Sequence, residues 1–374
     1  MHLSSLLGLA EWEEFRRAFL SHRPVIHADG QMSDRFRTLW AEWELTAACR
    51  FTTETAQETF RLLLRSKVIK PPAFTDRFGE FREEAYVQLR RAGASVAFGG
   101  WENLSNQALA LSRTLEAELN LPVQINLYVT PGGNQGLGAH VDPHDVLVLQ
   151  IQGEKNWDIY SQDPASGPDP IQITLKQGSW LYLPKGTRHE VQNRSPLESV
   201  HFTIGFHPLT WGEVFQRALD RARVAALELN ERPPHPGATD TAPDLQRRLH
   251  SVLPFVDLQN AYANYHAAFP ALAVPVPAAA TQDRMWTDTL SEDSRLRWRD
   301  EAALTLTSER NPRVALDYRR FPITLRHAWS HAAAWMQEAK VFRVEAIPTE
   351  DRSTALLLAK FLMNLGVLSR VEED

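Results

Sequence analysis

The amino-acid sequence predicts a mainly β core, an antiparallel sandwich or barrel, with helical segments before and after it in the chain. Residues 121–206 hold a series of short strand-like runs, which Gly, Pro and Asn separate at frequent intervals. The runs are 123–129, 145–151, 157–160, 171–175, 179–183 and 199–206. Many short strands with regular turn residues indicate antiparallel pairing, because parallel strands need long crossover connections that are usually helices.

The segment before the barrel, up to about residue 120, is predicted to be mainly helical. Its clearest helix spans 103–120, where apolar residues recur at helical spacing after Asn103 or Ser105, either of which suits the N-cap position. Those apolar residues are Leu104, Ala108, Leu111, Leu115 and Leu119. Further upstream, the short β-branched run 23–27 is predicted to form an edge strand.

Helical periodicity returns after the barrel. A helix is predicted over 211–229, opened by Thr210 and Glu213 at capping-box spacing. Its apolar face is expected to pack against neighbouring helices or a second subunit. The segments that follow are two amphipathic stretches at 245–253 and 256–269 and a Pro/Ala-rich linker at 270–277.

The C-terminal region mixes short strands and helices and is predicted to form a winged-helix-like domain. The predicted elements are strands at 303–307 and 313–318 and helices at 325–338 and 351–365, with Gly366 as a helix C-cap. The sequence therefore predicts three units, which are 1–208 for the barrel and its N-terminal helices, 209–281 for the helical segment and linker, and 282–374 for the C-terminal domain.

Composition excludes several classes of protein. The chain has 374 residues, of which 43% are hydrophobic and 23% charged, and this excludes global disorder and a coiled coil. A net charge of −6 and a pI near 6.1 exclude the basic surface of a general nucleic-acid binder. The single cysteine, Cys49, excludes an internal disulfide and a thiolate zinc site. Since no apolar run approaches the ~20 residues of a membrane span, we expect a cytoplasmic protein without a membrane partner.

Three side chains of the barrel region form a candidate metal site. His140 and Asp142 make a His-x-Asp pair, and their side chains share one face of a strand because strand side chains alternate with period two. His189, on a neighbouring strand, can complete the set. Two histidines and one carboxylate on a single triangular face leave three coordination positions open, which suits non-haem Fe(II).

The segment around His189 supports this interpretation. Residues 178–193 read Gly-Ser-Trp-Leu-Tyr-Leu-Pro-Lys-Gly-Thr-Arg-His-Glu-Val-Gln-Asn, which matches without a gap the second motif of cupin proteins, G-x5-P-x-G-x2-H-x3-N. Pro184 and Gly186 are predicted to make a tight turn between two strands. His189 then enters the second strand and is expected to face the barrel interior.

With these motifs the chain resembles the JmjC-type, cupin-fold 2-oxoglutarate oxygenases, and within them the ribosomal oxygenase branch. The clearest match spans 140–157, where the His-Val-Asp strand is followed by a Gly-Glu-Lys-Asn-Trp turn, and weaker matches lie at 126–131 and 199–204. The resemblance implies a double-stranded β-helix, the jelly-roll fold of cupins, and a homodimer formed through the helical segment after the barrel.

The resemblance also implies a role for each site residue. His140, Asp142 and His189 would hold Fe(II) as the catalytic centre, Lys155 would pair with the distal carboxylate of 2-oxoglutarate, and Asn126, Tyr128 and Thr203 would add hydrogen bonds to it. A bound dicarboxylate needs one end chelated and the other neutralised, and a lysine is a compact charge for that purpose. Two nearby histidines, His144 and His201, stay outside the predicted set.

Three functions are compatible with these features. The first is hydroxylation of a side chain of a protein substrate, with a ribosomal protein favoured by the resemblance. The second is oxygenation of RNA, a small molecule or a peptide natural product, because the iron chemistry is common to all and specificity resides in loops. The third is a cupin that binds its ligand without turnover. An intact metal triad with a candidate 2-oxoglutarate lysine favours an enzyme.

Overall fold

The fold is seen in a computed structural model of the chain. The structure describes residues 3–53, 59–161, 169–208, 210–225, 246–247, 250–251, 253–264, 276, 286–306, 311–317, 319 and 322–371. The predicted linker at 270–277 lies outside the described residues except for Val276. In the described part of the chain no helix is long and apolar enough to cross a membrane.

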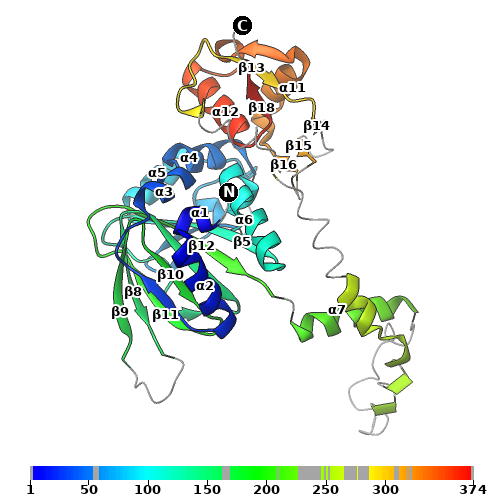
Figure 1. Cartoon of the computed structure of the whole chain (residues 1–374). Coiled ribbons are helices and arrows are strands. Elements are labelled where there is room, and N and C mark those ends of the chain that lie inside the picture. The colour runs from blue at the N-terminus through cyan, green and yellow to red at the C-terminus, as the bar shows by residue number, and fades with distance from the viewer. Residues whose placement is uncertain are drawn as a thin grey trace.

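The centre of the molecule is a barrel of two antiparallel sheets (Figure 1). One sheet contains, in spatial order, β10 (Trp180–Leu183), β7 (Asp145–Gln152), β12 (Ser199–Phe206) and β5 (Val123–Thr130). The facing sheet has the order β6 (His140–Val141), β11 (Arg188–Gln192), β8 (Glu154–Ile159) and β9 (Ile171–Lys176). Successive strands alternate between the two sheets except for β8 and β9, which pair with each other in the second sheet, and this is the double-stranded β-helix that the sequence predicted.

The first sheet continues beyond the barrel on both sides. The added strands are β1 (Val25–His27) next to β10, and β4 (Ser95–Phe98), β2 (Phe60–Leu64) and β3 (Lys67–Ile69) beyond β5. β1 confirms the predicted edge strand. The prediction of a mainly helical N-terminal segment is incomplete, because β2, β3 and β4 are short and their side chains are almost continuously apolar. Such runs lack the alternation that distinguishes a half-buried strand from a helix.

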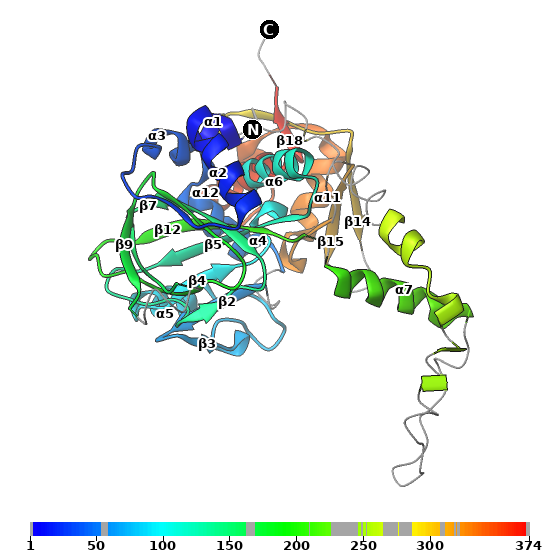
Figure 2. The same ribbon diagram turned by 60° about the horizontal axis from the view of Figure 1, so that its bottom comes forward.

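Helices cover the outer face of the larger sheet (Figure 2). These helices are α1 (Leu3–Leu7), α2 (Leu9–Ser21), α3 (Ser33–Phe36), α4 (Glu42–Phe51), α5 (Glu83–Arg91) and α6 (Asn106–Leu119). On α2, the ring of Phe15 lies 5.5 Å from that of Tyr182 and 5.6 Å from that of Phe206. Burying an aromatic or aliphatic side chain of this size contributes ~1.5–3 kcal/mol, so this apolar layer stabilises the sheet that carries the site.

The side chains of β5 point alternately into this core and into the barrel interior. Ile125, Leu127 and Val129 are buried in the helix-covered core. Asn126 and Tyr128, at the intervening positions, face the opposite side and line the barrel interior. The strand therefore presents polar groups inward because its apolar groups are held by the helices.

After the barrel, the chain forms α7 (Trp211–Ala225), close to the predicted helix at 211–229.

The C-terminal elements are β13 (Arg295–Trp298), β14 (Ala302–Leu306), β15 (Pro312–Leu316), β16 (Ile323–Thr324), α11 (Ser330–Ala339), β17 (Val341–Arg343), α12 (Arg352–Asn364) and β18 (Leu368–Arg370). β14, β15, α11 and α12 correspond to the predicted strands and helices, whereas the other four strands were not predicted. Leu365 is the C-cap residue of α12, and Gly366 follows it with φ +78°. The rings of Phe51 on α4 and Phe361 on α12 lie 5.8 Å apart, so this region packs on the N-terminal helices. Its winged-helix assignment stays a prediction.

One glycine, directly before the strand that carries Lys155, lies where two backbone segments come into close contact. Gly153, in the turn from β7 to β8, has φ +65°, and a Cβ added there would lie 2.2 Å from the carbonyl oxygen of Glu198. The turn therefore sits directly on the loop before β12, where no side chain fits. This close approach explains a glycine at the start of the Gly-Glu-Lys turn.

We expect Gly153→Ala to lower the free energy of unfolding by about 2–4 kcal/mol, because the left-handed backbone and the steric clash both oppose a side chain. Gly133→Ala is the matched control: its φ is +69° but an added Cβ meets nothing within 4 Å. It should cost about 1 kcal/mol, the backbone contribution alone. Urea denaturation measures both, and equal losses would contradict the packing role of Gly153.

Candidate functional site

All seven predicted site residues line one pocket inside the barrel. The pocket has a volume of about 70 Å³, and we call it the triad pocket. The seven residues are His140, Asp142 and His189, with Lys155, Asn126, Tyr128 and Thr203. They come from five different strands and their adjoining turns, so only the folded barrel brings them together.

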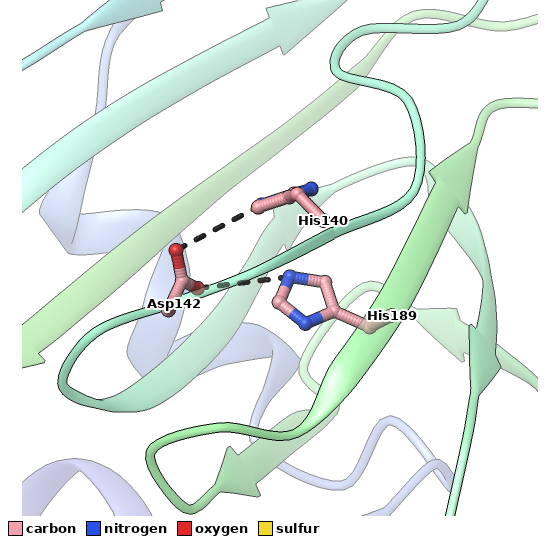
Figure 3. Close-up of side chains that lie close together, drawn as sticks. All are labelled: His140, Asp142 and His189. Atoms are coloured by element: carbon pink, nitrogen blue, oxygen red, sulfur yellow. Dashed lines mark ion pairs between the residues drawn. The ribbon is translucent and has the colours of Figure 1, made fainter.

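Three of these side chains form a compact cluster (Figure 3). Nε2 of His140 lies 3.8 Å from Oδ1 of Asp142, and Nε2 of His189 lies 3.7 Å from Oδ2 of the same carboxylate. One donor atom from each residue lies within 4.8 Å of the others, which is a spacing that one metal ion can bridge. Among the described residues no other group of three histidine, cysteine or carboxylate side chains meets this spacing.

Backbone pairing and hydrogen bonds fix both imidazole rings. His140 on β6 is the direct cross-strand partner of His189 on β11. Nδ1 of His140 lies 2.8 Å from the carbonyl oxygen of Gly138, and Nδ1 of His189 lies 3.0 Å from that of Thr187. Each Nδ1–H donates to its carbonyl, so the Nε2 lone pairs point into the cluster. Metal-binding histidines are usually oriented in this way.

A tight turn of the cupin-like motif holds the carboxylate strand against β11. The amide of Gly186 donates to the carbonyl oxygen of Asp142 at 3.1 Å, and the amide of Lys185 donates to Oδ1 of Asp145 at 2.7 Å. Gly186 has φ +85°, a conformation that strongly favours glycine. The Pro-Lys-Gly sequence thus sets the distance between the two strands that carry the cluster.

The electrostatics of the cluster suit a divalent cation. Burial lowers the pKa of His189, so its ring is neutral near pH 7 and can donate a lone pair. The side chains of His140 and Asp142 are partly exposed, which leaves access to the cluster from one side. Two neutral imidazoles and one carboxylate with open positions are the donor set of non-haem Fe(II) centres, and the residues present fit that ion.

Lys155 lines the triad pocket at a distance from the cluster along β8, since the cross-strand partner of His189 is Ile159, four residues after Lys155, and we call this the other end of the pocket. Its side chain is 2% exposed, and Nζ donates to Oγ1 of Thr130 at 2.5 Å. Among the described residues no carboxylate forms an ion pair with it, and burial lowers its pKa to about 7. A buried ammonium without a counter-charge is costly. The residues present therefore fit a ligand that brings its own carboxylate, as 2-oxoglutarate does.

Strands β5 and β12 form the wall between these two ends. The rings of Tyr128 and His201, which are cross-strand partners, stack with centroids 4.9 Å apart. Burial raises the pKa of Tyr128 to about 12, so its hydroxyl stays a donor. Burial, followed by the nearby Lys155 charge, holds the pKa of His201 well below its usual range. Thr203 and Asn126 are also cross-strand partners on this wall.

Sequence reasoning gave no role to Thr130, a lining residue of the pocket. Thr130 contacts Lys155, and it follows Asn126 and Tyr128 at every second position along β5. The resemblance gave the two earlier residues, and the period-two alternation of a strand, carried on from them, could have identified Thr130. His144 also lines the pocket but lies outside the three-residue cluster, in agreement with its exclusion from the predicted triad.

Comparison with known proteins agrees with this geometry. Residues 103–214 match the JmjC domain. A bifunctional lysine-specific demethylase and histidyl-hydroxylase NO66 of Dictyostelium discoideum is 30% identical over 155 residues, which cover 37% of this chain and 30% of that protein. Ribosomal oxygenase 1 of Bos taurus is 28% identical over 184 residues, which cover 44% of this chain and 26% of that protein. The matches therefore span less than a third of these relatives.

One solved structure aligns with almost the whole chain. YcfD, a ribosomal oxygenase from Escherichia coli, aligns over 96% of this chain and 98% of its own, with a TM-score of 0.44 and 17% identity. A second structure of YcfD contains cobalt and 2-oxoglutarate. The chain carries a JmjC domain, the domain of Fe(II)- and 2-oxoglutarate-dependent oxygenases, and is similar in sequence to the ribosomal oxygenases.

Proposed function

We propose that the protein is an Fe(II)- and 2-oxoglutarate-dependent oxygenase that hydroxylates a side chain of a protein substrate, a ribosomal protein in the first instance. The observation that carries this proposal is the arrangement of the triad pocket, in which a three-donor cluster lies at one end and, at the other, a buried lysine that has no carboxylate partner among the described residues. The ribosomal substrate rests on the relatives named ribosomal oxygenases.

Each residue of the pocket has a task in this reaction. His140, Asp142 and His189 would hold the iron, and Lys155 with Thr130 would hold the distal carboxylate of 2-oxoglutarate. When bound, iron and 2-oxoglutarate activate dioxygen, so that one oxygen atom enters a substrate C–H bond and the other leaves in succinate as carbon dioxide is released. The protein orients the reactants, excludes water and needs no acid–base pair of its own.

Tyr128, Asn126 and Thr203 would orient the co-substrate between those ends. Their side chains lie on one wall of the pocket, and the neutral Tyr128 hydroxyl can donate to an anionic oxygen. The apolar side chains of Val146, Val148 and Val191 complete the lining. Polar contacts in such a low-dielectric surrounding are stronger than in water, which favours one pose of the ligand.

Incubation of the full chain with Fe(II), 2-oxoglutarate, dioxygen and isolated ribosomes tests the proposal. We expect succinate formation and a mass increase of one oxygen atom on a ribosomal protein, and Asp142→Ala should abolish both because one of three metal ligands is lost. His144→Ala, a pocket histidine outside the cluster, is the matched control for metal binding and should retain Co(II) absorption. Oxygenated RNA with unmodified proteins would instead support an RNA substrate.

The lowered pKa of Lys155 predicts that the protein takes up a proton when it binds 2-oxoglutarate. With a pKa of about 7, the amine is mostly neutral at pH 8 in the empty pocket. A bound carboxylate favours the ammonium form and raises the pKa, so affinity should fall as pH rises above 7, by up to about tenfold per pH unit. Below about pH 6 the amine is already charged, and the pH dependence from this group should vanish.

Calorimetric titration of the Mn(II)-loaded protein in two buffers with different ionisation enthalpies measures this uptake. Nearly one proton per 2-oxoglutarate is expected at pH 8 and little at pH 6. Lys155→Met should remove the uptake and weaken binding about 100-fold, the scale of a lost buried charge-assisted bond. Lys176→Met, on the exposed end of the neighbouring strand β9, is the matched control. Wild-type binding at pH 8 without proton uptake would contradict the assignment.

The proposal includes a homodimer formed through α7. This helix buries Val214 and Ala218 in a small cluster with Ala261, and its Ala222 is buried as well. It leaves Trp211 and Val224 exposed, at 67% and 84%. Large apolar residues that remain exposed on an amphipathic helix favour a partner surface.

We expect a dimeric mass in solution by light scattering at micromolar concentration. Trp211→Glu should shift the mass toward the monomer, because a charge would have to be buried in the interface. Leu20→Glu, which changes an equally exposed leucine on α2, should leave the dimer intact. A monomeric wild type would count against this part of the proposal.

A further inference from the structure

The hairpin formed by β2 and β3 lies beside the triad pocket. β3 is the outermost strand of the larger sheet, and β2 separates it from β4 (Figure 2). Leu63 on β2 and its partner Ser95 on β4 both line the pocket. At the tip, Oγ of Ser66 lies 4.0 Å from where a Cβ on Gly138 would be, and the carbonyl oxygen of Gly138 holds the ring of His140. The tip is therefore next to the segment that leads into the metal cluster.

This hairpin concentrates positive charge. Residues 60–70 contain four cations and no acidic residue, whereas the whole chain has a net charge of −6. The four are Arg61, Arg65, Lys67 and Lys70, which we call the hairpin cations, and all are exposed. None of their side chains forms an ion pair or a hydrogen bond with another described residue. A polyanion therefore meets an attractive local potential here.

Strand register brings two of the hairpin cations together on the side of the pocket. Arg61 pairs with Ala97, which pairs in turn with Tyr128 of the triad pocket, so these side chains share one face of the sheet. The pairing of β2 with β3, carried one position further, places Lys70 opposite Arg61. Like charges directly opposite one another destabilise a pair of strands. An anion held by both side chains would remove the repulsion.

The tip of the hairpin has a conformation that its residues do not favour. Arg65 and Ser66 have φ values of +50° and +62°. Positive φ at both positions is the requirement of a type I′ turn, for which Asn-Gly and Asp-Gly are the preferred sequences. Strained backbone of this kind is concentrated at sites that bind ligands. An arginine at this position therefore indicates a binding role, because it is a poor choice for the turn itself.

Protection of the sheet edge explains part of this charge and not the rest. Edge strands often carry lysine, because a charge opposes pairing with another sheet. Lys67 on β3 fits that role. Arg61 lies on β2, which is paired on both sides, and Arg65 lies in the turn. The two arginines need another explanation, and the guanidinium group suits phosphate.

An exposed aromatic ring follows the hairpin in the chain. Phe78 is 73% exposed, and the guanidinium of Arg77 lies 4.6 Å from the centre of its ring. The loop that carries them starts at the end of β3 and folds back on β2, where the rings of Phe74 and Phe60 lie 5.6 Å apart. Bases of single-stranded RNA stack on aromatic rings and on guanidinium planes. This pair favours RNA over an acidic polypeptide, whose carboxylate side chains have no flat ring to stack.

We propose that the β2–β3 hairpin is a docking site for a single strand of RNA, with the hairpin cations bound to its phosphates and Phe78 stacked on a base. The RNA is a partner held beside the triad pocket and not the molecule that is oxidised there. The choice of RNA rather than DNA rests on the proposed function, because a ribosomal protein belongs to a particle that contains RNA.

Fluorescence anisotropy of a labelled twelve-nucleotide RNA, titrated with the full chain, tests the docking site without any turnover. We expect a dissociation constant of about 10–100 μM at about 0.1 M salt, the range of binding dominated by phosphate contacts. Four such contacts predict that affinity falls about sevenfold when the salt concentration doubles, at a slope of about −0.7 per contact. A chain of twelve glutamates should compete at least fivefold more weakly, because it offers no bases for stacking.

Two double variants test the charge. Arg61→Gln with Lys70→Gln removes the facing pair, and it should weaken RNA binding at least tenfold and reduce the salt response to about threefold per doubling. Arg17→Gln with Arg23→Gln is the matched control. It removes two exposed cations on α2 and just before β1, at the opposite edge of the sheet, and should leave RNA binding within twofold of the wild type.

Two further variants separate binding from folding. Arg65→Asn with Ser66→Gly removes the tip charge and introduces the preferred type I′ turn, so it should raise the thermal unfolding midpoint while weakening RNA binding severalfold. Phe78→Ala should weaken RNA binding about fivefold and leave the salt response unchanged, because no charge is lost.

Three results would overturn the docking site. These are an equal loss of RNA binding in the control variant, equal competition by RNA and the glutamate chain, and tighter binding of DNA of the same sequence. Equal competition by the glutamate chain would point to an acidic polypeptide as the partner.

The outcomes remain distinct from those of the proposed function. If RNA binds as expected but no protein is oxygenated, the proposed function fails while the docking site stands. If a ribosomal protein is oxygenated but the hairpin variants bind RNA as the wild type does, the oxygenase proposal stands and the docking site is wrong.

Discussion

The pairing of β6 with β11 is the constraint on which the site depends. It places His140 opposite His189, and the amide of Gly186 ties the carbonyl of Asp142 to the same turn. β6 has just two residues, so its position is set by the strand beside it and by the turn. The three side chains converge because the barrel closes at this point, and no local sequence preference could bring them together.

Burial makes the two ends of the triad pocket suited to groups of opposite charge. At one end, desolvation keeps His189 neutral and ready to donate electrons to a cation. At the other, it leaves Lys155 without a carboxylate partner among the described residues. A chain optimised for stability alone would fill this position with an apolar residue. The polar lining is therefore better explained by a ligand that is charged at both ends than by the needs of folding.

The sequence predicted the barrel and the three candidate metal ligands more completely than it predicted the strands and helices around them. Alternation and turn residues identified the strands from Val123 to Phe206, and spacing in two motifs identified His140 and His189. The strands β2 and β4 were missed because side chains on both faces are buried, at every position of β4 and at every position of β2 except the exposed Arg61 and the partly buried Leu64, which obscures the period-two signal. Thr130 continues the alternation of β5, but its contact with Lys155 depends on where β8 lies in the folded barrel, and that information is not local to either segment.

The edge strand β1 has a consequence for how the protein folds. It pairs with β10, although Val25 and its partner Tyr182 belong to opposite ends of the oxygenase region. During synthesis β1 is made long before β10, so the edge of β10 stays open until the two pair, and in the finished sheet the three-residue β1 is the outer strand. Such non-local closure is slow, and an unpaired edge can join a second chain in the interval. Once β1 has paired, it covers the edge of β10 with a strand of only three residues, and such short edge strands limit association of one sheet with another.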